Sequence, residues 1–167
     1  MTIYLEDLVI GEKVIFGSHR FTKEEILIFA RDFDPQPFHV DEAAAERSIF
    51  GKLSASGWHT AAMWMRAMVD YRQRQAEADH RAGKVVPPSG PSPGINKLRW
   101  LKPVYVGDTI TYTSTVTDKL DDPKRPDWGI AVTHDEGVNQ KGEAVYSAIG
   151  RVYVKRREPL KTKPRGG

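Results

Sequence analysis

One stretch of this sequence predicts a helix that the rest of the molecule must cover. Residues 56–71 contain no proline, begin with a serine suited to the N-cap position and are rich in Ala, Met and Trp. Five apolar residues follow one another from Ala61 to Met65, and consecutive residues of a helix point to all of its sides. We therefore predict a helix that is buried all round. Its polar continuation, residues 72–83, is expected to project into solvent.

The second half of the sequence favours strands. Residues 95–101 are predicted as one strand, and residues 108–117 alternate threonines with larger apolar side chains. Further strands are predicted from Trp128 onward and over residues 143–154. Residues 84–94, the Pro-rich loop, hold four prolines and can form neither a helix nor a central strand.

The first half adds a short strand and two helices. Residues 12–20 hold enough Val, Ile and Phe for a strand. Thr22 and Glu25 have the spacing of a capping box, and the apolar residues behind them recur at the spacing of one helix face. Asp41 precedes Glu42 and three alanines, which predicts the N-cap of a second, short helix.

A buried helix followed by several long antiparallel strands points to the α+β class, with the sheet wrapped around the helix. This arrangement is the hot-dog fold, which we expect here as one domain over residues 1–154. A sheet of this kind exposes an edge strand, and pairing with a second copy conceals it. We therefore expect a homodimer, or a higher oligomer, in which two sheets join edge to edge.

The charge distribution argues against nucleic acid as a partner. The net charge is +3, but residues 155–167, the basic tail, hold six Lys or Arg and one Glu, a net of +5. The body is therefore slightly acidic, and the tail is expected to be solvated and flexible. No groove-reading motif accompanies the basic residues.

Other absences narrow the class of protein further. The sequence has no cysteine, which excludes disulfides, thiolate chemistry and Cys-based zinc sites. It has no apolar run of about 20 residues, the length that a membrane span needs. The N-terminus lacks the features of a secretory signal. Together these observations predict a cytoplasmic protein without a membrane partner.

One segment carries the elements of acid–base chemistry. Residues 34–41 read Asp-Pro-Gln-Pro-Phe-His-Val-Asp, so that Asp34 and His39 lie five residues apart across a turn stiffened by proline. Gly57 stands where the predicted central helix begins, and a helix N-terminus offers unpaired N–H groups. An acid, an imidazole and such a pocket can stabilise an enolate-like thioester oxygen while a proton moves.

These residues resemble the MaoC-like dehydratase family, which includes the (R)-specific enoyl-CoA hydratases. The family signature is Asp-x-Asn-Pro-aliphatic-His-x-Asp, then a Phe, then a His-Gly step that opens the helix. Asp34 matches the catalytic acid, His39 the catalytic imidazole and Gly57 the glycine. A later run, Leu101-Lys-Pro-Val-Tyr-Val-Gly-Asp-Thr109, resembles another family segment, and the similarity extends over about residues 5–155.

The sequence departs from the family signature at positions that bear on the substrate. Gln36 stands where Asn is usual, Phe38 replaces an aliphatic residue, and Ser56 replaces the histidine before Gly57. With Trp58, which follows the glycine, Gln36, Ser56 and Gly57 are our candidate substrate-binding residues. Ser56 serves equally well as a simple N-cap. For His59, pocket lining and plain packing are equally supported.

The resemblance implies that Asp34 and His39 hold one water against a trans-2-enoyl thioester and give a 3-hydroxyacyl thioester. The partner would be an acyl thioester, and neither a metal nor an organic cofactor is needed. Two other functions are considered. Hot-dog domains also host acyl-CoA thioesterases, although these do not generally carry the Asp…His pair. A non-catalytic acyl-CoA-binding subunit is the third reading, because Ser56 replaces the family's histidine.

Overall fold

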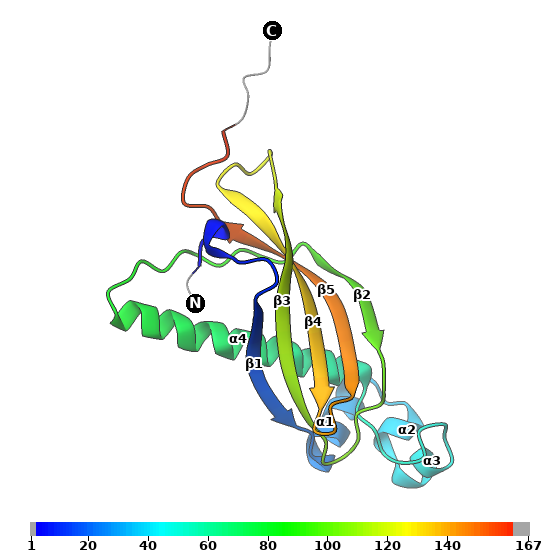
Figure 1. Ribbon diagram of the computed structural model, residues 1–167. Helices are drawn as coiled ribbons and strands as arrows, with labels where there is room; N and C mark the ends of the chain where they lie inside the picture. Colours follow the sequence, from blue (N-terminus) through cyan, green and yellow to red (C-terminus); the bar gives the residue numbers. More distant parts are fainter. Residues whose placement is uncertain (1–2, 162–167) are drawn as a thin grey trace.

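A long helix lies across one antiparallel sheet, as Figure 1 shows for the computed structural model, which describes residues 3–161. The elements are, in chain order, the 3₁₀ helix η1 (Leu5–Asp7), β1 (Lys13–Arg20), α1 (Lys23–Phe33), α2 (Pro37–Val40), α3 (Glu42–Glu46), α4 (Gly57–Arg81), β2 (Gly94–Trp100), β3 (Thr109–Asp121), β4 (Trp128–Asn139) and β5 (Ala144–Lys155). The predicted α+β class and hot-dog fold are confirmed, with α4 as the central helix.

The sheet has the strand order β1-β3-β4-β5-β2, and every neighbouring pair is antiparallel. β3 and β4 form a hairpin that is longer than the alternation over residues 108–117 predicts. The register shifts between Val116 and Asp118, where a bulge interrupts the alternation of the two faces. The predicted pattern therefore ends at the bulge although the strand continues.

The core lies between α4 and the concave face of the sheet. Its largest completely buried side chains come from the first half of the chain, β3 and β5: Phe21, Ile26, Ile110, Tyr112, Val145 and Tyr146. From α4, Trp64 packs into this cluster and is only 7% exposed. Figure 1 shows α1, α2 and α3 grouped at the end of the sheet where α4 begins.

The prediction that the central helix is buried all round is wrong for the single chain. Trp58, Met65 and Val69 of α4 are 60%, 40% and 37% exposed. Spacings of seven and four residues place these side chains on one face of the helix. The sheet covers only the opposite face, and an unbroken apolar run cannot indicate which face stays open. We call these three residues the open face of α4.

The structure also corrects the expected course of the basic tail. Lys155 still belongs to β5, and the two arginines that follow it contact η1. Arg156 pairs with Glu6, and Arg157 Nη2 lies 2.6 Å from a carboxylate oxygen of Asp7. The start of the tail is therefore fixed by acidic residues from the other end of the chain. Residues 162–167 lie outside the described part.

No helix within residues 3–161 is both long and apolar enough to span a membrane. The polar continuation of the central helix remains helical as far as Arg81. In Figure 1 this end of α4 extends past the sheet before the Pro-rich loop leads back to β2.

His59 packs into the core beside the first turn of α4. Its ring is stacked on Phe29, with 4.5 Å between ring centroids, and meets Phe21 edge-on. The side chain is 3% exposed, and its Nδ1 has no hydrogen-bond partner. Burial lowers the pKa of His59 to about 4, because a charged imidazole loses its hydration there. Of the two roles considered for this residue, the structure supports packing.

We predict that His59 makes the fold sensitive to acid. Its folded pKa lies below the unfolded value of about 6.5, so the unfolded chain binds the extra proton between pH 6.5 and 4. The stability that neutral His59 contributes is present above pH 6.5 and is lost as the pH falls from 6.5 toward 4. Between pH 7 and pH 5 this one group should cost about 2 kcal/mol of unfolding free energy.

Urea unfolding at the two pH values, in wild type and His59→Phe, measures this effect. Phenylalanine suits the aromatic surroundings and cannot take up a proton, so the variant should lose markedly less stability than wild type. An equal loss in both proteins would show that other groups cause the acid sensitivity.

Candidate active site

Proline sets the local backbone that carries the predicted acid and imidazole. Asp34 ends α1, because a residue that precedes proline is pushed out of the helical region, and its φ and ψ are −153° and 67°. Pro37 then opens α2 at a position where the missing N–H costs nothing. His39 lies within this single turn of helix, so its ring returns toward the end of α1.

The structure brings Asp34 and His39 together as the spacing predicts. Their nearest side-chain atoms, Oδ2 and Nε2, are 3.6 Å apart, and His39 is 6% exposed. His39 Nδ1 lies 2.8 Å from the carbonyl oxygen of Ser54, which can only accept a hydrogen bond. Nδ1 therefore carries the proton, and in the neutral ring Nε2 presents a free lone pair toward Asp34.

Two side chains orient the Asp34 carboxylate. Ser56 Oγ donates to Oδ2 over 2.6 Å, and Gln36 Nε2 donates to Oδ1 over 2.8 Å. Burial raises the pKa of Asp34, but the hydrogen bonds from Ser56 and Gln36 and the nearby His39 outweigh burial, and the pKa is lowered overall. The carboxylate is thus ionised at neutral pH. Gln36 fills the place of the usual Asn as a donor to the acid.

Ser56 has two roles at the start of α4. As N-cap, its Oγ accepts from the backbone N–H of Trp58 over 3.2 Å, while its proton goes to Asp34. One hydroxyl thus joins the acid to the first turn of the central helix. From the sequence, Ser56 was interpreted as an N-cap or as a substrate-binding residue. No sequence pattern indicated its hydrogen bond to Asp34.

Gly57 is the first residue of α4, and among the described residues its N–H has no hydrogen-bond acceptor. A Cβ at Gly57 would lie 2.6 Å from the indole ring of Trp100. Glycine is required here because a protein side chain occupies that space, so Gly57→Val would displace Trp100. Trp58 and Trp100 meet edge-on, 5.5 Å between centroids.

All six residues named from the sequence line one cavity of about 380 Å³: Asp34, Gln36, His39, Ser56, Gly57 and Trp58. Phe38, Phe50, Trp100 and Val145 add apolar wall, and Lys102 adds a positive charge. Sequence analysis missed Trp100 and the Ser54 carbonyl, which fixes the tautomer of His39. A backbone carbonyl leaves no trace in side-chain patterns, and Trp100 reaches the site only through strand pairing.

His59, for which the sequence supports two roles equally, does not line this cavity. Within residues 3–161, no group of three or more His, Asp or Glu side chains is arranged to hold a metal ion.

Comparisons with known proteins identify the family of this chain. The chain is 31% identical to YdeM of Bacillus subtilis, an uncharacterised protein, over 91% of this chain and 99% of that one. A MaoC-like dehydratase structure from Rhodospirillum rubrum is 37% identical, with a TM-score of 0.78, over 93% of this chain and 99% of the other.

A third relative matches over a shorter region. Mesaconyl-CoA hydratase of Cereibacter sphaeroides is 38% identical over 71 residues, which are 42% of this chain and 20% of that enzyme. The family model described as the MaoC-like domain matches residues 7–137, which include the acid, the imidazole and the whole central helix. The chain therefore belongs to the MaoC-like dehydratase family.

Proposed function

We propose that this protein is a hydro-lyase that reversibly adds water to a trans-2-enoyl thioester and gives a 3-hydroxyacyl thioester. The observation that carries this proposal is the Asp34–His39 pair. An ionised carboxylate and an imidazole with a free Nε2 face each other across 3.6 Å, inside a cavity that also holds a helix N-terminus. Membership of a dehydratase family supports the same class of reaction.

The proposed mechanism uses one water between Asp34 and His39. His39 Nε2 takes a proton from this water while the water oxygen attacks the β-carbon of the enoyl thioester. Asp34 accepts a hydrogen bond from the water and stabilises the imidazolium that forms. The pair then returns a proton to the α-carbon, so that the elements of water are added and no cofactor is consumed.

The thioester oxygen gains negative charge during this attack. The free N–H of Gly57, at the positive end of the α4 dipole, is the donor that we assign to it. Since Trp100 covers the Cα side of Gly57, the carbonyl would approach from the side of Asp34 and His39. The relative that acts on mesaconyl-CoA supports coenzyme A as the carrier.

The two alternatives predict different results. Ser56, which motivated the non-catalytic subunit, donates to Asp34 and so supports an intact acid. A non-catalytic chain would bind acyl-CoA without turnover. A thioesterase would release free thiol and no 3-hydroxy product.

We predict that Asp34→Asn and His39→Ala each reduce hydration of a trans-2-enoyl-CoA by about 10²–10⁴-fold, the usual share of a positioned acid–base group. Both residues act on one water, so the double variant should resemble the worse single variant. Loss of the enoyl thioester absorbance measures the rate, and circular dichroism checks the fold. Near-wild-type rates in either folded single variant would contradict the mechanism.

Ser56 should position Asp34, and its removal should change the pH profile. Without the hydrogen bond from Ser56 the pKa of Asp34 rises, so the acid side of the kcat/KM profile should move to higher pH in Ser56→Ala. The rate above this limb should fall roughly tenfold or more, since hydrogen bonds to charged groups contribute about 1.5–3 kcal/mol.

Ser56→Thr is the matched control, because threonine keeps both the hydroxyl and a good N-cap. This variant should restore the wild-type acid limb. A Ser56→Ala enzyme that is merely less stable, with an unmoved profile, would show that the serine acts only as a helix cap.

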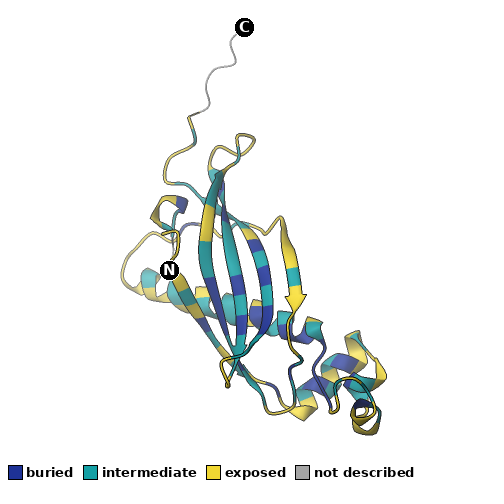
Figure 2. Cartoon of the chain, turned by 45° about the vertical axis from the view of Figure 1, so that its right-hand side comes forward, coloured by how far each residue is buried: buried dark blue, intermediate teal, exposed yellow. Residues whose placement is uncertain are grey.

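We further propose a homodimer that covers the open face of α4 and the free edge of β2. Among the described residues β2 pairs only with β5, and Figure 2 shows β2 exposed along most of its length. Unpaired strand edges and apolar helix faces are both concealed when two copies associate. Trp100 of β2 contacts Trp58 of the open face, so the two surfaces are continuous.

We predict that light scattering after gel filtration finds a dimer at micromolar concentration and that Met65→Glu shifts it to monomer. The new charge would be buried at the interface without a partner. Arg66→Glu, which places the same side chain on a neighbouring position that is 72% exposed, should remain dimeric. A monomeric wild type would refute the proposed interface.

A further inference from the structure

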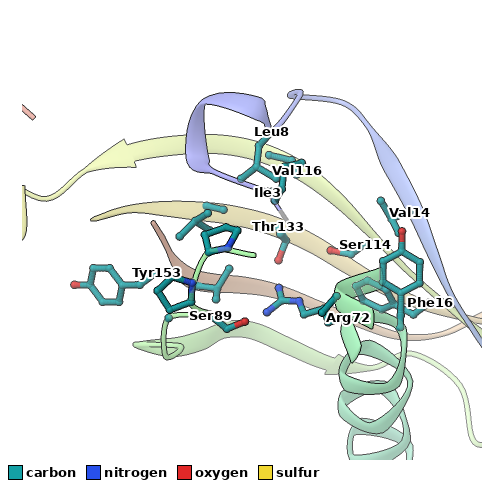
Figure 3. Close-up of a pocket in the computed structure, with 18 of the residues that line it drawn as sticks. Ile3, Leu8, Val14, Phe16, Arg72, Ser89, Ser114, Val116, Thr133 and Tyr153 are labelled. Atoms are coloured by element: carbon teal, nitrogen blue, oxygen red, sulfur yellow. The ribbon is translucent and has the colours of Figure 1, made fainter. Parts of the chain in front are cut away.

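A second cavity lies at the other end of α4. It has a volume of about 180 Å³, is partly open to solvent and is bordered by the C-terminal half of α4, the concave face of the sheet and the Pro-rich loop. Figure 3 shows this space, with Arg72 from α4 on one side and Thr133 and Ser114 from the sheet on another. Arg72 follows Gly57 by fifteen residues, so the two sites are about 22 Å apart along the helix.

The walls of this cavity are mainly apolar and come from separate parts of the chain. Val14 and Phe16 of β1, Val116 of β3 and Val152 of β5 supply hydrocarbon surface. The Pro-rich loop closes the cavity and is held to the sheet by the bridge between Ser89 and Val154. An apolar space of this kind can take the hydrocarbon part of a small ligand.

Arg72 projects its guanidinium into this apolar space, as Figure 3 shows. No hydrogen bond or ion pair to Arg72 is found among the described residues, although Glu12 also lines the cavity. The guanidinium keeps its charge at neutral pH and has five donors in a planar fork. It therefore offers two parallel hydrogen bonds to a carboxylate.

Two polar side chains beside Arg72 are already satisfied. Ser114 Oγ and Thr133 Oγ1 donate to the two oxygens of Asp135, over 2.6 and 3.2 Å. Asp135 is 1% exposed and attracts Arg72 without a hydrogen bond between them. Burial raises the pKa of Asp135, whereas the hydrogen bonds from Ser114 and Thr133 and the charge of Arg72 lower it. The guanidinium thus stays available to an anion from solution.

We propose that this cavity is a second ligand site, which binds a small organic monocarboxylate with its carboxylate on Arg72 and its apolar tail between β1, β3 and the Pro-rich loop. A comparable apolar cavity of about 150 Å³ accepts a benzene ring, so a tail of about five or six carbons fits. The proposal is independent of the hydration reaction, because it uses none of the residues around Asp34.

Isothermal titration of the full chain with hexanoate tests this site. Acetate has the charge without the tail, and 1-hexanol has the tail without the charge, so each should bind at least tenfold more weakly than hexanoate. Arg72→Gln should weaken hexanoate binding at least tenfold, because the charged fork is lost. Arg66→Gln is the matched control: it removes an arginine from the same helix outside the cavity and should bind hexanoate as wild type does.

A second variant keeps the test valid if Arg72→Gln fails to fold. Ala76→Leu fills part of the cavity from α4 and should also weaken hexanoate binding, while hydration of enoyl-CoA stays unchanged. Absence of hexanoate binding by wild type at millimolar concentration would overturn the proposal. Equal binding by the folded Arg72→Gln protein would overturn it too, since the ligand would then lie elsewhere.

Discussion

The hydrogen bond from Ser56 Oγ to Asp34 Oδ2 connects two helices, α1 and α4. Asp34 ends α1, and Ser56 caps α4, so this 2.6 Å contact fixes the acid relative to the N-terminus of the central helix. His39 is fixed separately by the carbonyl of Ser54, two residues before the cap. These two hydrogen bonds thereby fix the positions of Asp34 and His39 relative to the N–H of Gly57, the proposed donor to the thioester oxygen.

The parts of the site that sequence could predict are those set by short-range geometry. Asp34, Pro37 and His39 lie within six residues, and proline restricts the backbone between them so strongly that the spacing alone places both side chains in one cavity. Gly57 followed from the position of a helix start. The element order and the hot-dog fold followed from the strand patterns of the second half and from the unbroken apolar run of the central helix.

The missed features depend on contacts between distant segments. Trp100 reaches Gly57 because β2 pairs with β5, and no local pattern reports that register. The composition of the tail indicated solvated arginines, but in the folded chain Arg156 and Arg157 lie beside Glu6 and Asp7. The open face of α4 has the same apolar composition as the covered face, so only the position of the sheet distinguishes them. Ser56 lines the cavity, but its hydrogen bond to Asp34 could not be inferred from the sequence.

The two ends of the central helix line two cavities with different chemical character. At its N-terminal end, free N–H groups, an ionised acid and a fixed imidazole suit a reaction in which charge develops on a thioester oxygen. Toward its C-terminal end, an unpaired guanidinium in an apolar space suits recognition of a carboxylate without chemistry. Mass spectrometry of the products from a trans-2-enoyl-CoA tests the central claim most directly. The account predicts a 3-hydroxyacyl-CoA, heavier by one water and with the thioester intact. Free coenzyme A with unhydrated acid, or an unchanged substrate, would contradict it.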